Sequence, residues 1–99
     1  MAGQIRMTPE DMRSRAGDVD GQRNAFGDVI NRMDGILNQL ESEWDGAASR
    51  KFRQQFEDLR RTSFANMTQL LEDLSTQLRQ TAQAVEDLDN EIASKIGVR

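Results

Sequence analysis

The sequence contains two charged runs whose side chains could do chemistry. The acidic run Asp87-Leu88-Asp89-Asn90-Glu91 is similar to the opening of a calcium-binding loop, in which carboxylate and amide oxygens surround the ion. Such a loop needs glycine at its sixth position, and this chain has Ile92 there. A helical spacing of apolar residues also continues through the run. We therefore expect no metal site at this position.

The chain lacks the residue types that most catalytic sites need. It has no histidine and no cysteine, which removes the commonest general base, the commonest metal ligand and any thiolate nucleophile. Carboxylate pairs such as Glu41/Glu43 and Glu72/Asp73 point to different sides of a helix. No glycine-rich phosphate-binding loop is present. We expect a protein that is not an enzyme and that binds no metal and no cofactor.

The basic run at residues 50–61 does not indicate a nucleic-acid partner. Its charged side chains are Arg50, Lys51, Arg53, Glu57, Asp58, Arg60 and Arg61. Phe52 and Phe56, which could stack on bases, belong to an apolar series instead. The 99-residue chain as a whole has a formal net charge of −4, which disfavours binding to phosphate backbones.

The residues around these runs predict a long first helix over about residues 8–43. Thr8-Pro9-Glu10-Asp11 is typical of a helix start, with a capping threonine, a proline at the first position and acidic side chains near the positive helix end. The residues that follow are spaced alternately by four and three, as in the contact line of a coiled coil. They are Met12, Ala16, Val19, Arg23, Phe26, Ile30, Met33, Leu37, Leu40 and Trp44. Val29 and Ile36 widen this stripe.

A second helix is predicted over about residues 47–95, after a turn at residues 44–46. Gly46 can take the left-handed conformation that ends many helices, and Gly97 follows the second helix. Two successive steps of four, Leu70–Leu74–Leu78, bring the local period closer to 3.6 than to 3.5. The apolar series is Phe52, Phe56, Leu59, Ser63/Phe64, Met67, Leu70/Leu71, Leu74, Leu78, Thr81/Ala82, Val85, Leu88, Ile92 and Ile96.

The predicted fold is all-α, an antiparallel two-helix hairpin forming a single domain over residues 1–99. A short linker makes the two helices antiparallel neighbours. Two helices cannot enclose apolar stripes about 100° wide, so we expect two copies to form a four-helix bundle. The predicted dimer core is Phe26, Ile30, Met33, Leu37, Leu40, Phe56, Leu70, Leu74 and Leu78. Trp44 falls on the first contact line, and its ring is predicted to point into the hairpin.

Trp44-Asp45-Gly46, at the middle of a cysteine-free helical chain of this length, resembles the WXG-motif family of small type VII secretion substrates (early-secreted-antigen-like). The resemblance covers the whole chain. It implies a hairpin that dimerises, either head to tail with itself or with a related WXG-type hairpin. It also implies export in the folded state by an apparatus driven by an ATPase of the FtsK/SpoIIIE type.

Members of this family often carry a hydrophobic-xxx-Asp/Glu-xx-hydrophobic-xxx-hydrophobic pattern in their second helix. Val85, Asp89, Ile92 and Ile96 fit this pattern, and Val85 stands where other members have tyrosine. The resemblance implies that the Trp-x-Gly turn of one chain and the C-terminal segment of its partner together form the export signal. By spacing alone, the three apolar residues are also the last turns of the apolar stripe.

The expected function is that of a secreted, non-catalytic homodimeric interaction or adaptor protein. It would be made in the bacterial cytoplasm and exported without a cleaved signal peptide, because residues 1–7 contain no apolar segment. No stretch approaches the roughly 18 apolar residues of a membrane span. Alternatives are a membrane-active effector that disrupts lipid and a generic coiled-coil dimerisation module.

The two charged runs suggest how a dimer is steered. Residues 50–61 carry a local charge of +3 and residues 86–91 a local charge of −4. An antiparallel partner would bring the acidic end of one second helix toward the basic start of the other. The alternative is that both runs are solvated faces that contribute little to affinity.

Overall fold

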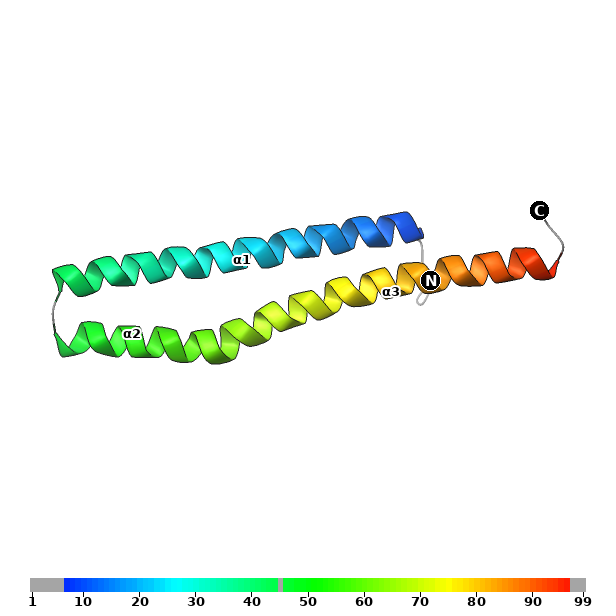
Figure 1. Cartoon of the computed structure of the whole chain (residues 1–99). Helices are drawn as coiled ribbons and strands as arrows, with labels where there is room; N and C mark the ends of the chain where they lie inside the picture. Colours follow the sequence, from blue (N-terminus) through cyan, green and yellow to red (C-terminus); the bar gives the residue numbers. More distant parts are fainter. Residues whose placement is uncertain (1–6, 45, 97–99) are drawn as a thin grey trace, which may run out of the picture.

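The computed structural model describes residues 7–44 and 46–96, which form a helical hairpin (Figure 1). α1 spans Pro9–Glu43, α2 spans Ala47–Leu59, η1 spans Arg60–Phe64 and α3 spans Ala65–Lys95. α2, η1 and α3 follow one another without a break and return along α1. Within the described residues there is no β-strand, and the predicted all-α antiparallel hairpin is confirmed. Gly97 lies outside the described residues.

α1 begins at a capping box. The backbone N–H of Asp11 donates to the Thr8 hydroxyl at 3.1 Å, and the backbone N–H of Thr8 donates to the Asp11 carboxylate at 3.2 Å. Pro9 occupies the first helical position, where its missing N–H costs nothing. Two of the N–H groups at the helix start therefore have partners within the chain.

The turn differs from the prediction at Gly46. Its φ and ψ are both 174°, an extended conformation that any residue adopts, so the predicted left-handed conformation was wrong. The reason is that Gly46 caps the start of α2 and does not close the end of α1. Its carbonyl accepts from the Arg50 N–H at 3.3 Å and from the Ser49 hydroxyl at 3.0 Å. Asp45 lies outside the described residues.

The second half of the hairpin contains a π-helical turn, η1, where the sequence predicted a regular helix. Phe56 and Phe64 both lie toward α1, and their positions differ by eight, one more than the seven of a heptad repeat. A π-turn is wider than an α-turn and takes up one extra residue. The single helix predicted for residues 47–95 is therefore two α-helices joined by this turn.

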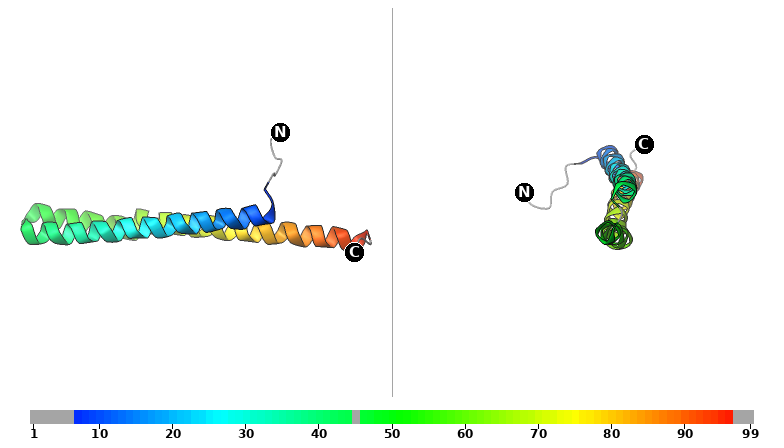
Figure 2. Two further views of the ribbon diagram at one scale, coloured as in Figure 1. Left: turned by 90° about the horizontal axis from the view of Figure 1, so that it is seen from above. Right: turned by 90° about the vertical axis from the view of Figure 1, so that its left-hand side faces the viewer.

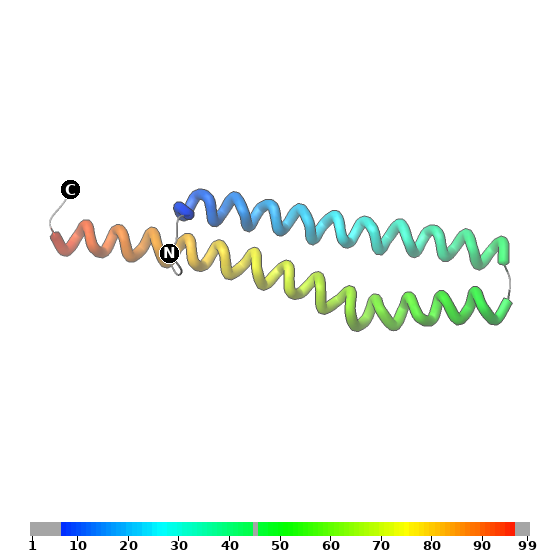
Figure 3. Tube along the Cα trace, turned by 180° about the vertical axis from the view of Figure 1, so that it is seen from behind, coloured from blue at the N-terminus to red at the C-terminus, as the bar shows by residue number. Residues whose placement is uncertain are grey.

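The hairpin is a thin rod with few buried side chains. It measures 75 × 23 × 19 Å, and the end-on view in Figure 2 shows one pair of helices with no further layer. The buried apolar side chains are Met12, Ala16, Leu37, Phe56 and Ala82. The last turns of α3 extend past the start of α1, as the tube in Figure 3 shows. No helix in the described part of the chain is long and apolar enough to cross a membrane.

Candidate interaction surface

One edge of the hairpin is closed by ion pairs between its two arms. Arg13 binds both oxygens of Glu86, at 2.7 and 2.8 Å. Further along, Arg79 binds Asp20 at 3.0 Å and Arg23 lies 3.4 Å from Glu72. The hydrogen bonds between Arg13 and Glu86 raise the pKa of Arg13 and lower the pKa of Glu86, because each group stabilises the charged form of the other.

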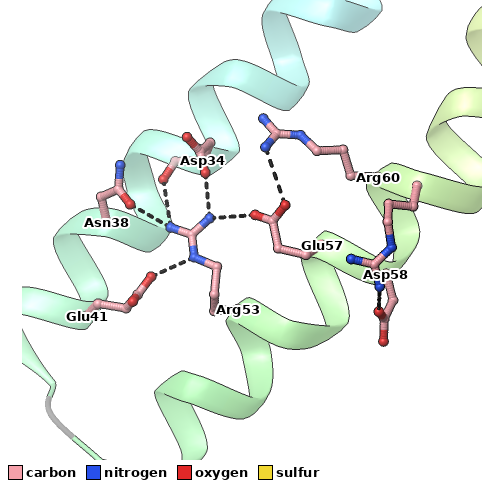
Figure 4. A network of polar contacts seen from close by, with 8 residues as sticks. Asp34, Asn38, Glu41, Arg53, Glu57, Asp58 and Arg60 are labelled. Atoms are coloured by element: carbon pink, nitrogen blue, oxygen red, sulfur yellow. Dashed lines mark hydrogen bonds and ion pairs between the residues drawn. The ribbon is translucent and has the colours of Figure 1, made fainter.

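Near the turn, Arg53 of α2 is the centre of the polar network drawn in Figure 4. Its Nε donates to Glu41 at 2.6 Å and its Nη2 donates to the Asn38 side-chain oxygen at 2.6 Å. Its Nη1 donates to Asp34 and, at 3.1 Å, to Glu57. The hydrogen bonds to Glu41 and Asp34 raise the pKa of Arg53 above its ordinary value. Its side chain is 19% exposed, so this cation is largely enclosed by α1.

These contacts change the interpretation of the two charged runs. Arg53 pairs with α1, and Arg60 and Arg61 pair with Glu57 and Asp58 of the same arm. In the acidic run, Glu86 pairs with Arg13 and Glu91 with Lys95. Part of the charge that could have steered a partner is therefore compensated within one chain.

The opposite side of the hairpin is apolar and uncovered. On α1, Val29, Met33, Ile36 and Leu40 follow one another at spacings of four, three and four, so they share one face. Ion-pairing residues such as Asp20, Asp34 and Glu41 are spaced by sevens on a different face. In the part of α3 that follows η1, Met67, Leu70 and Leu74 are exposed on the same side. We call these seven apolar residues the outer face.

The exposure of the outer face is high for large apolar side chains. Leu70 is 60% exposed and Val29 is 54% exposed. Ala25, Phe26 and Leu71 line a shallow hollow between α1 and α3 together with Val29 and Met67, so the face is continuous across the two arms. A contiguous apolar surface of this kind on a small chain marks an interaction site.

The structure divides the predicted dimer core into two groups. Leu37 and Phe56 are buried within the single hairpin, and Phe26, Ile30 and Leu78 are half-buried there. Met33, Leu40, Leu70 and Leu74 lie exposed on the outer face. Leu37 and Phe56 thus hold one chain together, and the exposed group remains available to a partner.

Trp44 lies at the tip of the hairpin, and its predicted inward orientation was wrong. The residue is 44% exposed, and its ring contacts that of Phe52, with 6.0 Å between centroids. The reason is that Trp44 is already the C-cap of α1, and within the described residues its ring lies beside α2 at the open end of the hairpin. Phe52 is itself 52% exposed, so the tip presents two aromatic rings. A Cβ at Gly46 would meet no atom within 4 Å, so the hairpin alone does not require glycine there.

The C-terminal pattern lies at the other end of the rod. Val85 is half-buried, Asp89 is exposed, and Ile92 and Ile96 are 49% and 68% exposed. Leu88, also exposed, lies one turn before Ile92. Within a single chain, therefore, the tip with Trp44 and this C-terminal segment lie at opposite ends (Figure 1).

Sequence reasoning missed two kinds of residue that matter for packing. Ser49 and Ser75 are buried, and the Ser75 hydroxyl donates to the Ala16 carbonyl at 3.4 Å. Arg53 was predicted only as part of a basic run that either faces a partner or is solvated. The missed signal is spacing: Ser49, Arg53 and Phe56 are separated by four and three residues, which places all three toward α1.

The fold and the turn place this chain among small helical hairpins that carry a Trp-x-Gly sequence between their two arms. The WXG100 family, described as "Proteins of 100 residues with WXG", matches residues 4–90. The chain belongs to this family.

Individual relatives are similar over nearly their whole length. Protein YukE of Bacillus subtilis is 38% identical over 96 residues, which cover 97% of this chain and 98% of the relative. The type VII secretion system extracellular protein A of Staphylococcus aureus is 25% identical over 95 residues, covering 96% and 97%. Among solved structures, EsxA of Geobacillus thermodenitrificans is 39% identical with a TM-score of 0.80, covering 94% of this chain and 99% of that one.

Proposed function

We propose that this protein is a substrate of a bacterial type VII secretion system, exported as a non-catalytic homodimer that acts by binding other proteins. Membership of the WXG100 family and similarity to a type VII extracellular protein support export. The single observation that carries the dimer is the outer face, where seven apolar side chains are each at least 38% exposed. A second hairpin would cover them and complete a four-helix bundle.

Head-to-tail packing of the two hairpins fits the distribution of exposed residues. It brings the Trp44 and Phe52 rings of one chain beside Leu88, Ile92 and Ile96 of the other. The exposed apolar side chains at each end of one chain are then covered by those of the opposite end of the other chain, and the same contact occurs twice, as in an isologous interface. This proposal gives Gly46 a role that the single hairpin does not, because a partner's helix would approach the open space beside it. An ATPase of the FtsK/SpoIIIE type would bind these combined ends.

A non-catalytic role fits the chemistry available on the surface. Among the described residues no cluster of three or more carboxylates could hold a metal ion. The hollows along the rod are open, and the hollow beside η1 is lined by a mixture of Ile30, Asn31, Arg60 and Gln69 with no nucleophile and base in contact. Binding through the apolar face is the activity that this surface supports.

A membrane-active role has less support than a dimer. Interfacial helices combine an apolar face with an edge rich in lysine and arginine. The edge of this hairpin alternates in sign, with Arg13, Asp20 and Arg23 in order along α1.

The dimer is tested by mass in solution. Light scattering at micromolar concentration is expected to give twice the 11.2 kDa of the chain. Leu70→Glu should give the mass of one chain with helix content retained, because it places a charge in the interface. Gln80→Glu, at an exposed position outside the outer face, is the matched control and should remain dimeric. A wild-type mass of one chain contradicts the dimer.

Export is tested in a bacterium that carries a type VII system. Wild-type chain is expected in the culture medium only when the secretion ATPase is present. Trp44→Ala and removal of residues 85–99 should each abolish export while the chain accumulates in the cells. Export of both variants at the wild-type level contradicts a role for these segments and favours a coiled-coil module of another kind.

A further inference from the structure

The position of η1 decides which apolar side chains of the second arm face α1. From the last residue of η1 onward, the inward positions are Phe64, Thr68, Leu71, Ser75 and Leu78, all buried or half-buried. Met67, Leu70 and Leu74 lie outward and are 44%, 60% and 44% exposed. This division exists because the π-turn takes up the extra residue between Phe56 and Phe64. We call it the open arrangement.

The same extra residue fits further along the helix, and the sequence supports that place as well. With the π-turn near residues 75–78, the segment 63–74 would be rotated by one position, about 100°. Met67, Leu70 and Leu74 would then face α1. The outward positions would be Asn66, Gln69 and Asp73, all of them polar. The two steps of four at Leu70–Leu74–Leu78 coincide with this second place. We call it the closed arrangement.

The open arrangement has specific anchors. The Phe64 ring packs on Phe26 and Phe56, at centroid distances of 5.8 and 6.0 Å. Ser75 is 4% exposed and accepts from Arg79 at 2.9 Å. The Thr62 hydroxyl donates to the Asp58 carbonyl at 2.7 Å, which supplies a donor where the π-turn interrupts the regular backbone ladder.

The closed arrangement has a different advantage. It covers three large apolar side chains that the open hairpin leaves in water, and in exchange it releases Phe64, Leu71 and two hydroxyl residues, Thr68 and Ser75. Burial of apolar surface is the main favourable contribution in both cases. Each arrangement therefore has its own support, and they differ in whether the apolar surface is covered by α1 or offered outward.

We propose that η1 is a switch between a closed hairpin that covers Met67, Leu70 and Leu74 against α1 and an open hairpin that offers these three side chains to a second copy of the chain. The proposal rests on the proposed homodimer, because the second copy is what covers Met67, Leu70 and Leu74. A second copy binds only the open arrangement and shifts the population toward it. The apparent affinity of the wild-type dimer is lowered by the fraction of chains that are closed.

Two single-residue deletions fix the two arrangements. Each removes the extra residue and leaves regular heptads. Deletion of Ser63 keeps Phe64, Leu71 and Leu78 toward α1, as in the open arrangement. Deletion of Thr76 places Met67, Leu70 and Leu74 toward α1, whereas Phe56 and Leu78 keep their places. The variants have the same length and are matched controls for each other.

Dimer dissociation constants from sedimentation equilibrium, with helix content from circular dichroism, test the switch. The Ser63 deletion is expected to dimerise about threefold or more tightly than wild type, because it removes the closed arrangement. The Thr76 deletion is expected to dimerise at least about tenfold more weakly, with wild-type helix content, because its outward positions are polar.

These measurements test the switch and the dimer separately. Equal affinities of the two deletion variants, with a dimeric wild type, overturn the switch and leave the dimer in place. A monomeric wild type overturns the proposed function instead. If the Thr76 deletion loses helix content, the Ser63 deletion decides alone, and an affinity equal to or below wild type overturns the proposal.

Discussion

Arg53 connects the two arms of the hairpin near the turn. A guanidinium presents five N–H donors in a planar fork, and Arg53 directs them to Asp34, Asn38 and Glu41 of α1 and to Glu57 of its own helix. Thus a residue in the middle of a basic run acts as a contact between helices. A lysine has the same charge but cannot reach these acceptors at once.

Arg53→Lys is therefore expected to lower the midpoint of thermal unfolding, measured by circular dichroism at one fixed chain concentration. Arg61→Lys is the matched control, because Arg61 pairs only with Asp58 on its own arm in the described structure. It should leave the midpoint nearly unchanged. Equal lowering by both substitutions would show that charge alone, and not the fork, is what matters at Arg53.

Glu86 gives the hairpin a dependence on acid. The Arg13 guanidinium holds the pKa of Glu86 below its ordinary value of 4.5 in the folded chain. A lowered folded-state pKa stabilises the fold at pH values above the unfolded-state pKa, and this stabilisation is lost as the pH falls through the folded-state pKa. Glu86→Gln should therefore lose less stability than wild type between about pH 5 and about pH 3.

Urea unfolding at a series of pH values measures this difference. Glu91→Gln is a suitable control, since Glu91 pairs only with Lys95 on an exposed part of α3 within the described residues. Its profile should follow that of wild type. If the free energy of unfolding of Glu86→Gln falls with pH as much as that of wild type, Glu86 does not contribute to the pH dependence of stability.

At the scale of the elements, the first helix could be predicted and the second only in outline. The cap at Thr8 fixes where α1 begins, and the 4,3 spacing correctly places Met12, Ala16 and Leu37 toward the second arm, whereas Met33 and Leu40 of the same series are exposed. In the second arm, adjacent residues such as Leu70 and Leu71 both fit an apolar contact line. The spacing alone therefore does not decide which of the two adjacent residues faces α1. The π-turn and the outward position of Leu70 follow from packing against α1, which sequence does not specify.

Gly46 and Trp44 show the same limit at the turn. Glycine after a helix predicts a left-handed residue, but whether it ends one helix or starts the next depends on the path of the chain between them. The orientation of the Trp44 ring depends on how many helices surround the tip. The sequence places Trp44 at the end of the apolar series, but it does not show how few helices lie beside the tip.

The capping box is an element-scale feature with a measurable contribution. Thr8→Ala removes the side-chain acceptor for the Asp11 N–H and is expected to lower the free energy of unfolding by about 1 kcal/mol. Thr8→Ser keeps the acceptor and should lie within a few tenths of a kcal/mol of wild type. Chemical denaturation at fixed chain concentration checks both values. A Thr8→Ser loss as large as that of Thr8→Ala would contradict the capping role.

At the scale of the whole molecule, the hairpin separates its polar and apolar contacts onto different sides. Ion pairs join the arms along one edge, and the outer face carries the apolar surface. This division follows from heptad spacing, so an apolar face left uncovered by the single hairpin was predictable from sequence. Which charges would be left for that partner was not, because it depended on pairs such as Arg13–Glu86 that lie 73 residues apart.

The division predicts how the dimer responds to salt. Since the outer face is apolar and Arg53, Glu86 and Glu91 pair within the chain, the dimer dissociation constant should change by less than about threefold between low and high ionic strength. Sedimentation equilibrium in about 50 mM and about 500 mM sodium chloride measures this change. A loss of affinity of tenfold or more would instead assign the basic and acidic runs to contacts between chains.

The open space beside Gly46 has a consequence for how substitutions at this turn would be scored in selection experiments. A library of variants sorted only for folded, protease-resistant chains should accept alanine at position 46, because no atom lies within reach of the added methyl group. A library sorted for appearance outside the cell should reject it. Different results of the two selections at position 46 would show that glycine is needed there for contacts with other proteins during export and not for folding of the single chain.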